Sequence, residues 1–322
     1  MFPALSFSPR FSMNHALTWM GHRWFGPAAV ALAALLGPVL ADQSPWTWGL
    51  CAVLFLVVGL PHGAVDHITY HHALGRNAKT APWRFAAPYL AGLAAFAAAF
   101  VWAPLLATWA FLVLASWHFG QSHVEVRTAE WLDRLRGFAL GAVILGTLLD
   151  EQSGVAKNVM TMWMTETGST WTLRTIGVGL PMLKLFWTAT AFMAWQRNPD
   201  GRTMSTRLLR EAAWVGAIWA LAQSGELLWA FTAYFCLGHA ADSWRAEFLH
   251  HQSLTSQFWT YYRWAWPFTL VSLVGLAAVA GASFAGWIGA HHAWAVLIAG
   301  TVPHMVLLDH WAPAQLRAER TR

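Results

Sequence analysis

Charged residues are scarce in this chain, and their scarcity argues against a soluble globular protein. Asp, Glu, Lys and Arg make up only 11% of the 322 residues, whereas hydrophobic residues make up 57%. Soluble domains are about 25% charged. Apolar stretches recur along nearly the whole length, and many approach the roughly 20 residues that a helix needs to cross a bilayer. The composition therefore predicts an all-α fold, a polytopic transmembrane helical bundle in which residues 1–322 form a single integral membrane domain.

Cysteine is almost absent, which argues against a disulfide framework. The chain has two cysteines, Cys51 and Cys236, and both lie inside apolar segments. They are not at ligand spacing, so a thiolate zinc site and an iron–sulfur cluster are also disfavoured. The net charge of +5 is typical of basic cytoplasmic loops in a membrane protein. We therefore expect no nucleic-acid partner, and we infer no obligate protein partner.

Ten apolar segments are expected to cross the membrane, although a count of eight or nine also fits because the fifth is short and the sixth contains Pro181 and Lys184. With a cytoplasmic N-terminus, 17 of the 20 Lys and Arg residues fall in cytoplasmic segments, as the positive-inside rule requires. We therefore expect a multi-pass protein of the inner (plasma) membrane. Its short cytoplasmic tails would be 1–23 and 311–322, and its first segment would be retained as a span. The expected spans are 24–41, 46–66, 85–102, 104–124, 137–149, 176–195, 211–223, 226–243, 264–282 and 288–309.

Four histidines lie at nearly the same depth in four of these segments. They are His62, His118, His239 and His304, on the second, fourth, eighth and tenth expected spans. All four spans run from outside to inside, and the histidines differ in depth by less than one helical turn. A single membrane histidine often bonds a carbonyl or a serine on a neighbouring helix. Four at one depth instead indicate one shared partner, and a metal ion is the simplest candidate.

Further polar residues follow about one turn deeper. Asp66 lies four residues after His62 and shares its helix face. Carboxylates beside ligand histidines commonly fix the orientation of the imidazole ring. We expect this layer to support the metal site, and it comprises Asp66, His67, His123 and Asp242, together with Asp309 and His310.

The identity of the metal is left open by the residue types. Neutral imidazoles suit iron, copper or zinc. An all-histidine iron(II) site with open positions can bind oxygen, whereas two paired histidines can hold a haem between helices. The spacing alone does not choose between them.

The motifs around these histidines resemble a known family. GLPHGAVDH at 59–67, SWHFG at 116–120, YFCLGH at 234–239 and TVPH at 301–304 are similar to segments of the Brp/Blh family of bacterial and archaeal β-carotene dioxygenases. The resemblance runs in order from about Gly59 to His310. It implies an integral membrane enzyme with non-haem Fe(2+) that cleaves the central double bond of β-carotene, or a related carotenoid, with O2 to give retinal.

The resemblance also implies a set of iron ligands, and this chain departs from it at one position. The ligands proposed for the family are the histidine of PHG, the histidine of HFG and an H-x-x-x-H pair. These match His62, His118 and His239, but the fourth position is Ser243. We expect His304 to complete the layer, with His123 and His67 as the alternatives.

A lipophilic carotenoid would reach such a site laterally from the membrane lipid, through a tunnel lined by aromatic side chains. Trp117, Phe119, Tyr234 and Phe235 flank the motif histidines and are the candidates for this lining, with ordinary helix packing as the alternative. Two other functions stay open at this point: a haem-binding redox or electron-transfer membrane protein, and a non-catalytic relative that binds a carotenoid or retinoid.

Overall fold

The computed structural model describes residues 24–40, 44–73, 83–124, 131–197, 201–251 and 254–310. The two expected tails, 1–23 and 311–322, lie outside these residues. The described part of the chain contains helices and no strand. In chain order they are α2 (Phe25–Leu40), α3 (Pro45–Leu54), η1 (Phe55–Gly59), α4 (Leu60–Ala64), α5 (Asp66–Ala73), α6 (Trp83–Trp102), α7 (Pro104–His123), α8 (Trp131–Glu151), α9 (Ser153–Met160), α10 (Glu166–Arg197), α11 (Gly201–Ser224), α12 (Leu227–Ala233), η2 (Tyr234–Ala240), α13 (Ala241–His250), α14 (Phe258–Phe284), α15 (Ala290–Ala299) and α16 (Val302–His310).

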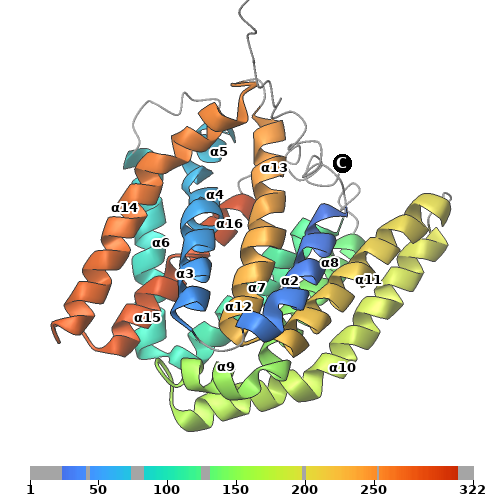
Figure 1. Cartoon of the computed structure of the whole chain (residues 1–322), viewed down its shortest axis with the longest axis horizontal. Helices are drawn as coiled ribbons and strands as arrows, with labels where there is room; N and C mark the ends of the chain where they lie inside the picture. Colours follow the sequence, from blue (N-terminus) through green and yellow to red (C-terminus); the bar gives the residue numbers. More distant parts are fainter. Residues whose placement is uncertain are drawn as a thin grey trace, which may run out of the picture.

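Two helical segments, each made of consecutive helices, run side by side through the middle of the molecule, α3 to α5 and α12 to α13 (Figure 1). Each is interrupted by a π-helical stretch, η1 in the first and η2 in the second. The indole N–H of Trp244 on α13 donates to the carbonyl of Val58 in η1 at 3.2 Å. This bond holds the two segments in one position along each other. It therefore also helps to set the relative position of His62 on the first segment and His239 on the second.

Helices α7 and α8 pack through small residues at close range. Gly137 and Gly141 of α8 form a GxxxG motif that faces Ser116 and Gly120 of α7. A Cβ atom added to Gly120 would lie 1.8 Å from the carbonyl oxygen of Gly137, and one added to Gly141 would lie 1.9 Å from that of Ser116. Such motifs let helix backbones touch within a membrane. Because successive residues turn by about 100°, His118, midway between Ser116 and Gly120, lies on the opposite face of α7.

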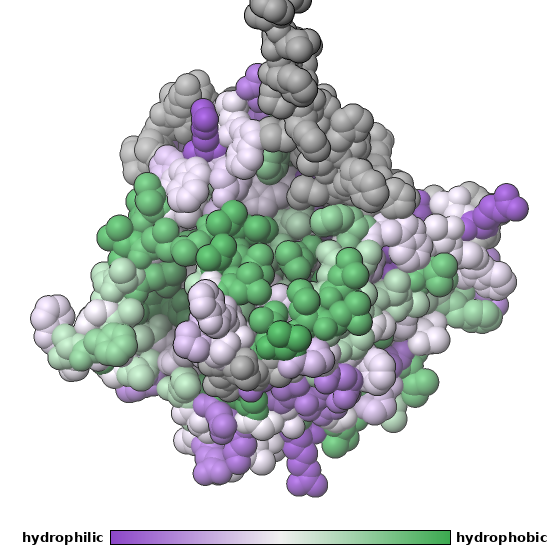
Figure 2. Space-filling model, viewed as in Figure 1, coloured by the Kyte–Doolittle hydropathy of each residue, from purple (hydrophilic) through white to green (hydrophobic). Residues whose placement is uncertain are grey.

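Four helical segments are long and apolar enough to cross a membrane, namely Pro45–His71, Arg84–Trp102, Glu166–Arg197 and Phe258–Phe284. They contain the second, third, sixth and ninth expected spans. Figure 2 shows an apolar band across the viewed face, with hydrophilic residues below it, over α9 and the start of α10. These observations support a helical membrane protein. The other six spans and the cytoplasmic placement of the termini stay predictions.

The last expected span, 288–309, is wrong as a single helix. Helix α15 ends at Ala299 and α16 begins at Val302, so the segment is two short helices. Pro303, at the second position of α16, has no backbone N–H and is tolerated only in the first turn of a helix. The break places His304 in the first turn of a new helix rather than far along a continuous one.

Candidate metal centre

The structure gathers the four predicted histidines at one point. His62 lies on α4, His118 on α7, His239 within η2 and His304 on α16, and their exposed fractions are 4%, 2%, 0% and 6%. The rings form a closed cycle with each in contact with two others. Centroid distances are 4.8 Å for His62–His304, 5.1 Å for His304–His118, 4.8 Å for His118–His239 and 5.6 Å for His239–His62. Side chains from four distant parts of the sequence therefore surround one buried point.

Three of these histidines meet the geometric requirement for a shared ion. One ring nitrogen from each of His62, His239 and His304 lies within 4.8 Å of those of the other two. Imidazole nitrogen is a good ligand for iron, copper and zinc. The donor set present in the chain therefore fits a buried transition-metal ion.

His118 lies against this group of three. Its Nε2 atom is 3.1 Å from Nε2 of His239. This distance fits an N–H···N hydrogen bond between the rings. It also fits two ligands at right angles on one ion, since bonds of about 2.1 Å place such nitrogens about 3 Å apart. His118 therefore neighbours the group at His239, although it is not among the three residues whose ring nitrogens all lie within 4.8 Å of one another.

Hydrogen bonds to the outer nitrogens orient three of the rings. Nδ1 of His62 donates to the carbonyl of Gly59. Nδ1 of His304 bonds Oδ2 of Asp66 at 2.8 Å, and Nδ1 of His239 bonds Oγ of Ser122 at 3.1 Å. A proton held on Nδ1 leaves the lone pair of Nε2 for a metal. The Gly59 carbonyl and the Asp66 carboxylate only accept, so they hold the rings of His62 and His304 in the ligand tautomer, whereas the Ser122 hydroxyl orients the ring of His239 without fixing its tautomer.

Asp66 carries the first testable prediction. Asp66→Ala removes the carboxylate that holds the His304 ring, and we expect the affinity of the site for a transition-metal ion to fall about 10- to 100-fold. Asp66→Asn should cost less, because its amide oxygen still accepts from Nδ1. Chelator competition on the purified protein measures the affinity. Asp150→Ala, a half-buried aspartate at the far end of α8, is the matched control, and equal affinity in Asp66→Ala and wild type would contradict the role.

The π-helical stretches explain how His62 and His239 come to face each other. η1 ends at Gly59, whose carbonyl accepts from His62, and η2 contains His239. A π-helical turn inserts an extra residue and rotates everything after it, and such turns are frequent at functional sites. Sequence reasoning missed both stretches, because no residue pattern in these segments distinguishes a π-turn from an α-turn.

Two histidines of the predicted deeper layer point elsewhere. Nδ1 of His67 bonds the carbonyl of Ala64 at 2.9 Å, and its ring packs on Phe268 with centroids 4.3 Å apart. Nε2 of His123 bonds the hydroxyl of Tyr234 at 3.1 Å, and its ring packs on Trp214 at 4.2 Å. The hydrogen bonds and ring contacts described for His67 and His123 do not reach the four rings of the cycle, whereas Asp66 bonds His304 directly.

Asp242 makes its described contacts away from the four rings, and Ser243 makes no described contact with them. The carboxylate of Asp242 faces Gly26 of α2, and the cations that interact with it are Arg245 and Arg210. Ser243 is buried, and within the described residues its hydroxyl has no hydrogen-bond partner. The side chains of Asp309 and His310 lie outside the described part of the structure.

Aromatic rings flank the cycle on one side. Phe119 packs edge-on against His239 at 4.7 Å, and Phe235 contacts both His62 at 5.3 Å and His239 at 5.8 Å. Phe55 and Phe231 extend Phe235 into a stack, with Phe231 and Phe235 inclined by only 8°. Sequence reasoning missed Phe55 and Phe231, although Phe55 lies seven residues before His62 and Phe231 eight residues before His239.

The other two candidates for a tunnel lining are placed differently. Tyr234 is buried, and its hydroxyl bonds His123 rather than facing the cycle. Trp117 is half-buried, and its neighbours on α7, Ser116 and His118, face α8 and the cycle respectively. That Tyr234 and Trp117 line a substrate tunnel therefore remains a prediction.

Comparison with known proteins gave one match. The model of the family described as beta-carotene 15,15'-dioxygenase matches residues 53–312, well over half of the chain. Neither the curated proteins nor the solved structures gave a match. The matched range includes all four histidines and both π-helical stretches.

Proposed function

The chain belongs to the beta-carotene 15,15'-dioxygenase family, and from this premise we propose that it is an iron(II) oxygenase that cleaves the central double bond of β-carotene or a related carotenoid. The observation that carries the proposal is the buried group of His62, His239 and His304, whose ring nitrogens lie close enough to share an ion. Membership of a dioxygenase family and a buried group of imidazole nitrogens both support oxygenation at a bound metal ion.

His62, His239 and His304 would hold Fe(2+), and His118 would be the fourth ligand. His304 then takes the place of the family histidine that is Ser243 in this chain. When bound, iron would supply the binding and activation of dioxygen. Gly59, Asp66 and Ser122 hold the outer nitrogens of three of these rings, and the acceptors Gly59 and Asp66 leave the inner lone pairs of His62 and His304 for the metal.

The proposed reaction needs no reductant. One C=C bond of the polyene and the O–O bond of dioxygen break, two C=O bonds form, and both oxygen atoms leave in two retinal molecules. The side chains therefore have to position the polyene and keep water out. The stacked rings of Phe55, Phe231 and Phe235 end against His62, and a flat conjugated chain can pack along them. A carotenoid dissolved in the membrane lipid would enter from the side.

A haem between paired histidines fits this site poorly. Each ring of the cycle contacts two others, with centroids no more than 5.6 Å apart. A porphyrin is a flat plate much wider than an imidazole, so it would have to push two of the four rings aside. The geometry therefore supports a single ion rather than a haem.

The cellular setting follows from the same proposal. We propose a multi-pass protein of the inner membrane, with residues 1–322 as a single integral domain and both termini cytoplasmic. Its partners would be the carotenoid, O2 and the surrounding lipid, with no nucleic acid and no obligate protein partner.

Co-expression in a bacterial host that accumulates β-carotene tests the activity. We expect cells with the wild-type chain to lose their orange colour and to contain retinal, because the product no longer absorbs as the full polyene does. Cells with His62→Ala, which lacks one ligand, should stay orange.

Orange cells with no retinal, while the wild-type protein is present in the membrane, would contradict the proposal. Metal analysis of the same purified protein then separates the alternatives. Absence of iron together with co-purified pigment would identify a non-catalytic carotenoid- or retinoid-binding relative.

A further inference from the structure

A sharp break separates α15 from α16, immediately before the histidine that α16 brings to the cycle. The N–H of Thr301 donates to the carbonyl of Ile298 at 3.2 Å, and a bond from the N–H of Met305 to the carbonyl of Thr301, also at 3.2 Å, begins the next helix. The carbonyl of Gly300 lies between these two bonds. A backbone carbonyl inside a membrane has no water to accept from, so it needs a donor from the protein.

Tyr89 on α6 supplies that donor, because its hydroxyl donates to the carbonyl of Gly300 at 3.2 Å, across 211 positions of sequence. Helix α6 packs against both α15 and α16. Positions 92 and 93 follow position 89 by three and four residues and so share its face. A Cβ atom added to Gly92 would lie 3.4 Å from Cγ of Pro303. One added to Gly300 would lie 4.0 Å from Cδ1 of Leu93. One face of α6 therefore holds the break in place.

The same tyrosine lies near the carboxylate that orients His304. Tyr89 interacts electrostatically with Asp66, and its ring packs on Phe85 with centroids 5.3 Å apart. Asp66 in turn bonds Nδ1 of His304 at 2.8 Å. Because His304 lies only four residues after Gly300, a shift of the break would move the imidazole ring relative to its carboxylate and to the other three rings.

Resting on the proposed function for the role of His304 as a ligand, we propose that Tyr89 is a positioning residue for His304. By holding the break at Gly300, its hydroxyl sets where the His304 ring meets the other rings of the cycle. Tyr89 acts through the placement of α16 rather than by contact with the ion. Its loss should therefore change how the metal is held, and not only how stable the fold is.

Binding of cobalt(II) to the metal-free full chain in detergent tests the proposal, because the visible absorption of cobalt(II) depends on the number and geometry of its ligands. Tyr89→Phe removes the hydroxyl and keeps the ring. We expect its cobalt affinity to fall about five-fold, less than the loss expected for Asp66→Ala, because Tyr89 acts one contact further from the ring. The absorption of the bound cobalt should also shift. A change that only destabilised the fold would leave that absorption as it is in wild type.

The double variant Tyr89→Phe with His304→Ala separates a positioning role from a general structural one. If Tyr89 acts through His304, removal of its hydroxyl should change cobalt affinity by less than about two-fold in a chain that already lacks the ring, since the effects of coupled residues do not add. An equal loss with and without the ring would overturn the proposal. If the chain without the ring binds cobalt too weakly to measure, the absorption decides, and an unchanged spectrum in Tyr89→Phe overturns the proposal.

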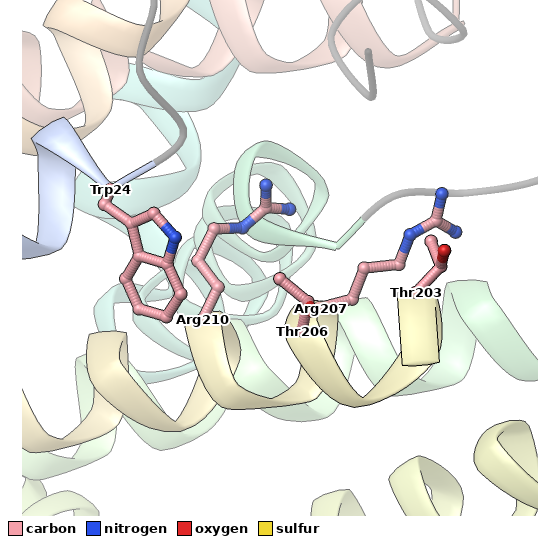
Figure 3. Close-up of a pocket in the computed structure, with 5 residues that line it drawn as sticks. All are labelled: Trp24, Thr203, Thr206, Arg207 and Arg210. Carbon is pink, nitrogen blue, oxygen red and sulfur yellow. The ribbon is translucent and has the colours of Figure 1, made fainter. Parts of the chain in front are cut away.

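Two variants that remove a hydroxyl elsewhere are the matched controls. Tyr261→Phe removes a buried hydroxyl that lies 3.2 Å from Nδ1 of His251. Thr206→Val removes a hydroxyl that donates to the carbonyl of Arg202 at 3.2 Å. Thr206 lines a pocket beside Trp24 that contains none of the four histidines (Figure 3). Both controls should bind cobalt as wild type does, and a five-fold loss in either would overturn the proposal, because loss of a hydroxyl would then act without the break.

Different results separate the role of Tyr89 from the metal centre itself. Wild-type affinity and absorption in Tyr89→Phe would overturn the role of Tyr89 and leave the metal centre standing. Wild-type affinity in His304→Ala would instead remove His304 from the metal centre, and would overturn both.

Discussion

Replacing His304 by alanine is expected to remove the iron and to lower retinal formation by at least about 100-fold. The ring is one of three whose nitrogens lie within 4.8 Å of one another, and Asp66 holds its outer nitrogen. Its removal takes away one of the proposed ligands and leaves the Asp66 carboxylate buried without its imidazole. A site that loses a ligand loses much of its metal-binding free energy. Elemental analysis of the purified protein and retinal production in carotenoid-accumulating cells measure the two effects.

His291→Ala is the control for this prediction. His291 is exposed at the start of α15, so its loss removes a histidine without touching the cycle. Normal iron content in His304→Ala would show that this ring only packs beside the site. Recovery of iron in His304→Ala with Ser243→His would instead show that the fourth ligand can occupy the position it has in the family pattern.

Replacing Gly141 by leucine is expected to prevent the close contact of α7 and α8. A Cβ atom at this position would lie 1.9 Å from the carbonyl oxygen of Ser116 and 2.7 Å from the backbone nitrogen of Gly120. Backbone atoms cannot rotate away as a side chain can, so the helices must separate. Overpacking of this kind lowers the free energy of unfolding by about 1–3 kcal/mol and occasionally more. Because the clash here is with backbone atoms, we expect a loss near the upper end of this range. We therefore expect a large fall in thermal stability of the detergent-solubilised protein.

The Gly141→Leu variant should also lose iron along with thermal stability, because the displaced helix α7 carries His118 on the face opposite to the contact. Gly275→Leu is the matched control. Gly275 lies on α14 with no atom within 4 Å of the added Cβ and is exposed to the surroundings. Equal thermal stability of Gly141→Leu and Gly275→Leu would show that α7 and α8 are not held by their small residues.

The relation between His62, Asp66 and His304 shows where sequence reasoning reached its limit. The spacing of four residues placed Asp66 on the helix face of His62 and predicted that it would support the metal site, without showing which ring it would hold. In the structure α4 ends at Ala64, α5 begins at Asp66, and the carboxylate bonds His304, 238 positions away in the sequence. A rule of local periodicity gives the neighbours of a residue on its own helix, but it does not give its partners on other helices.

The sequence alone determined that the chain is apolar and helical and to which family it belongs, and it singled out the four histidines that the structure brings together, because residue type and order are properties of the chain itself. The tertiary structure decided which ring nitrogens meet, which carboxylate holds them and which aromatic rings stand beside them. Those depend on how each helix is rotated about its axis. The π-turns of η1 and η2, the glycine contact of α7 with α8 and the break before Pro303 contribute to that rotation.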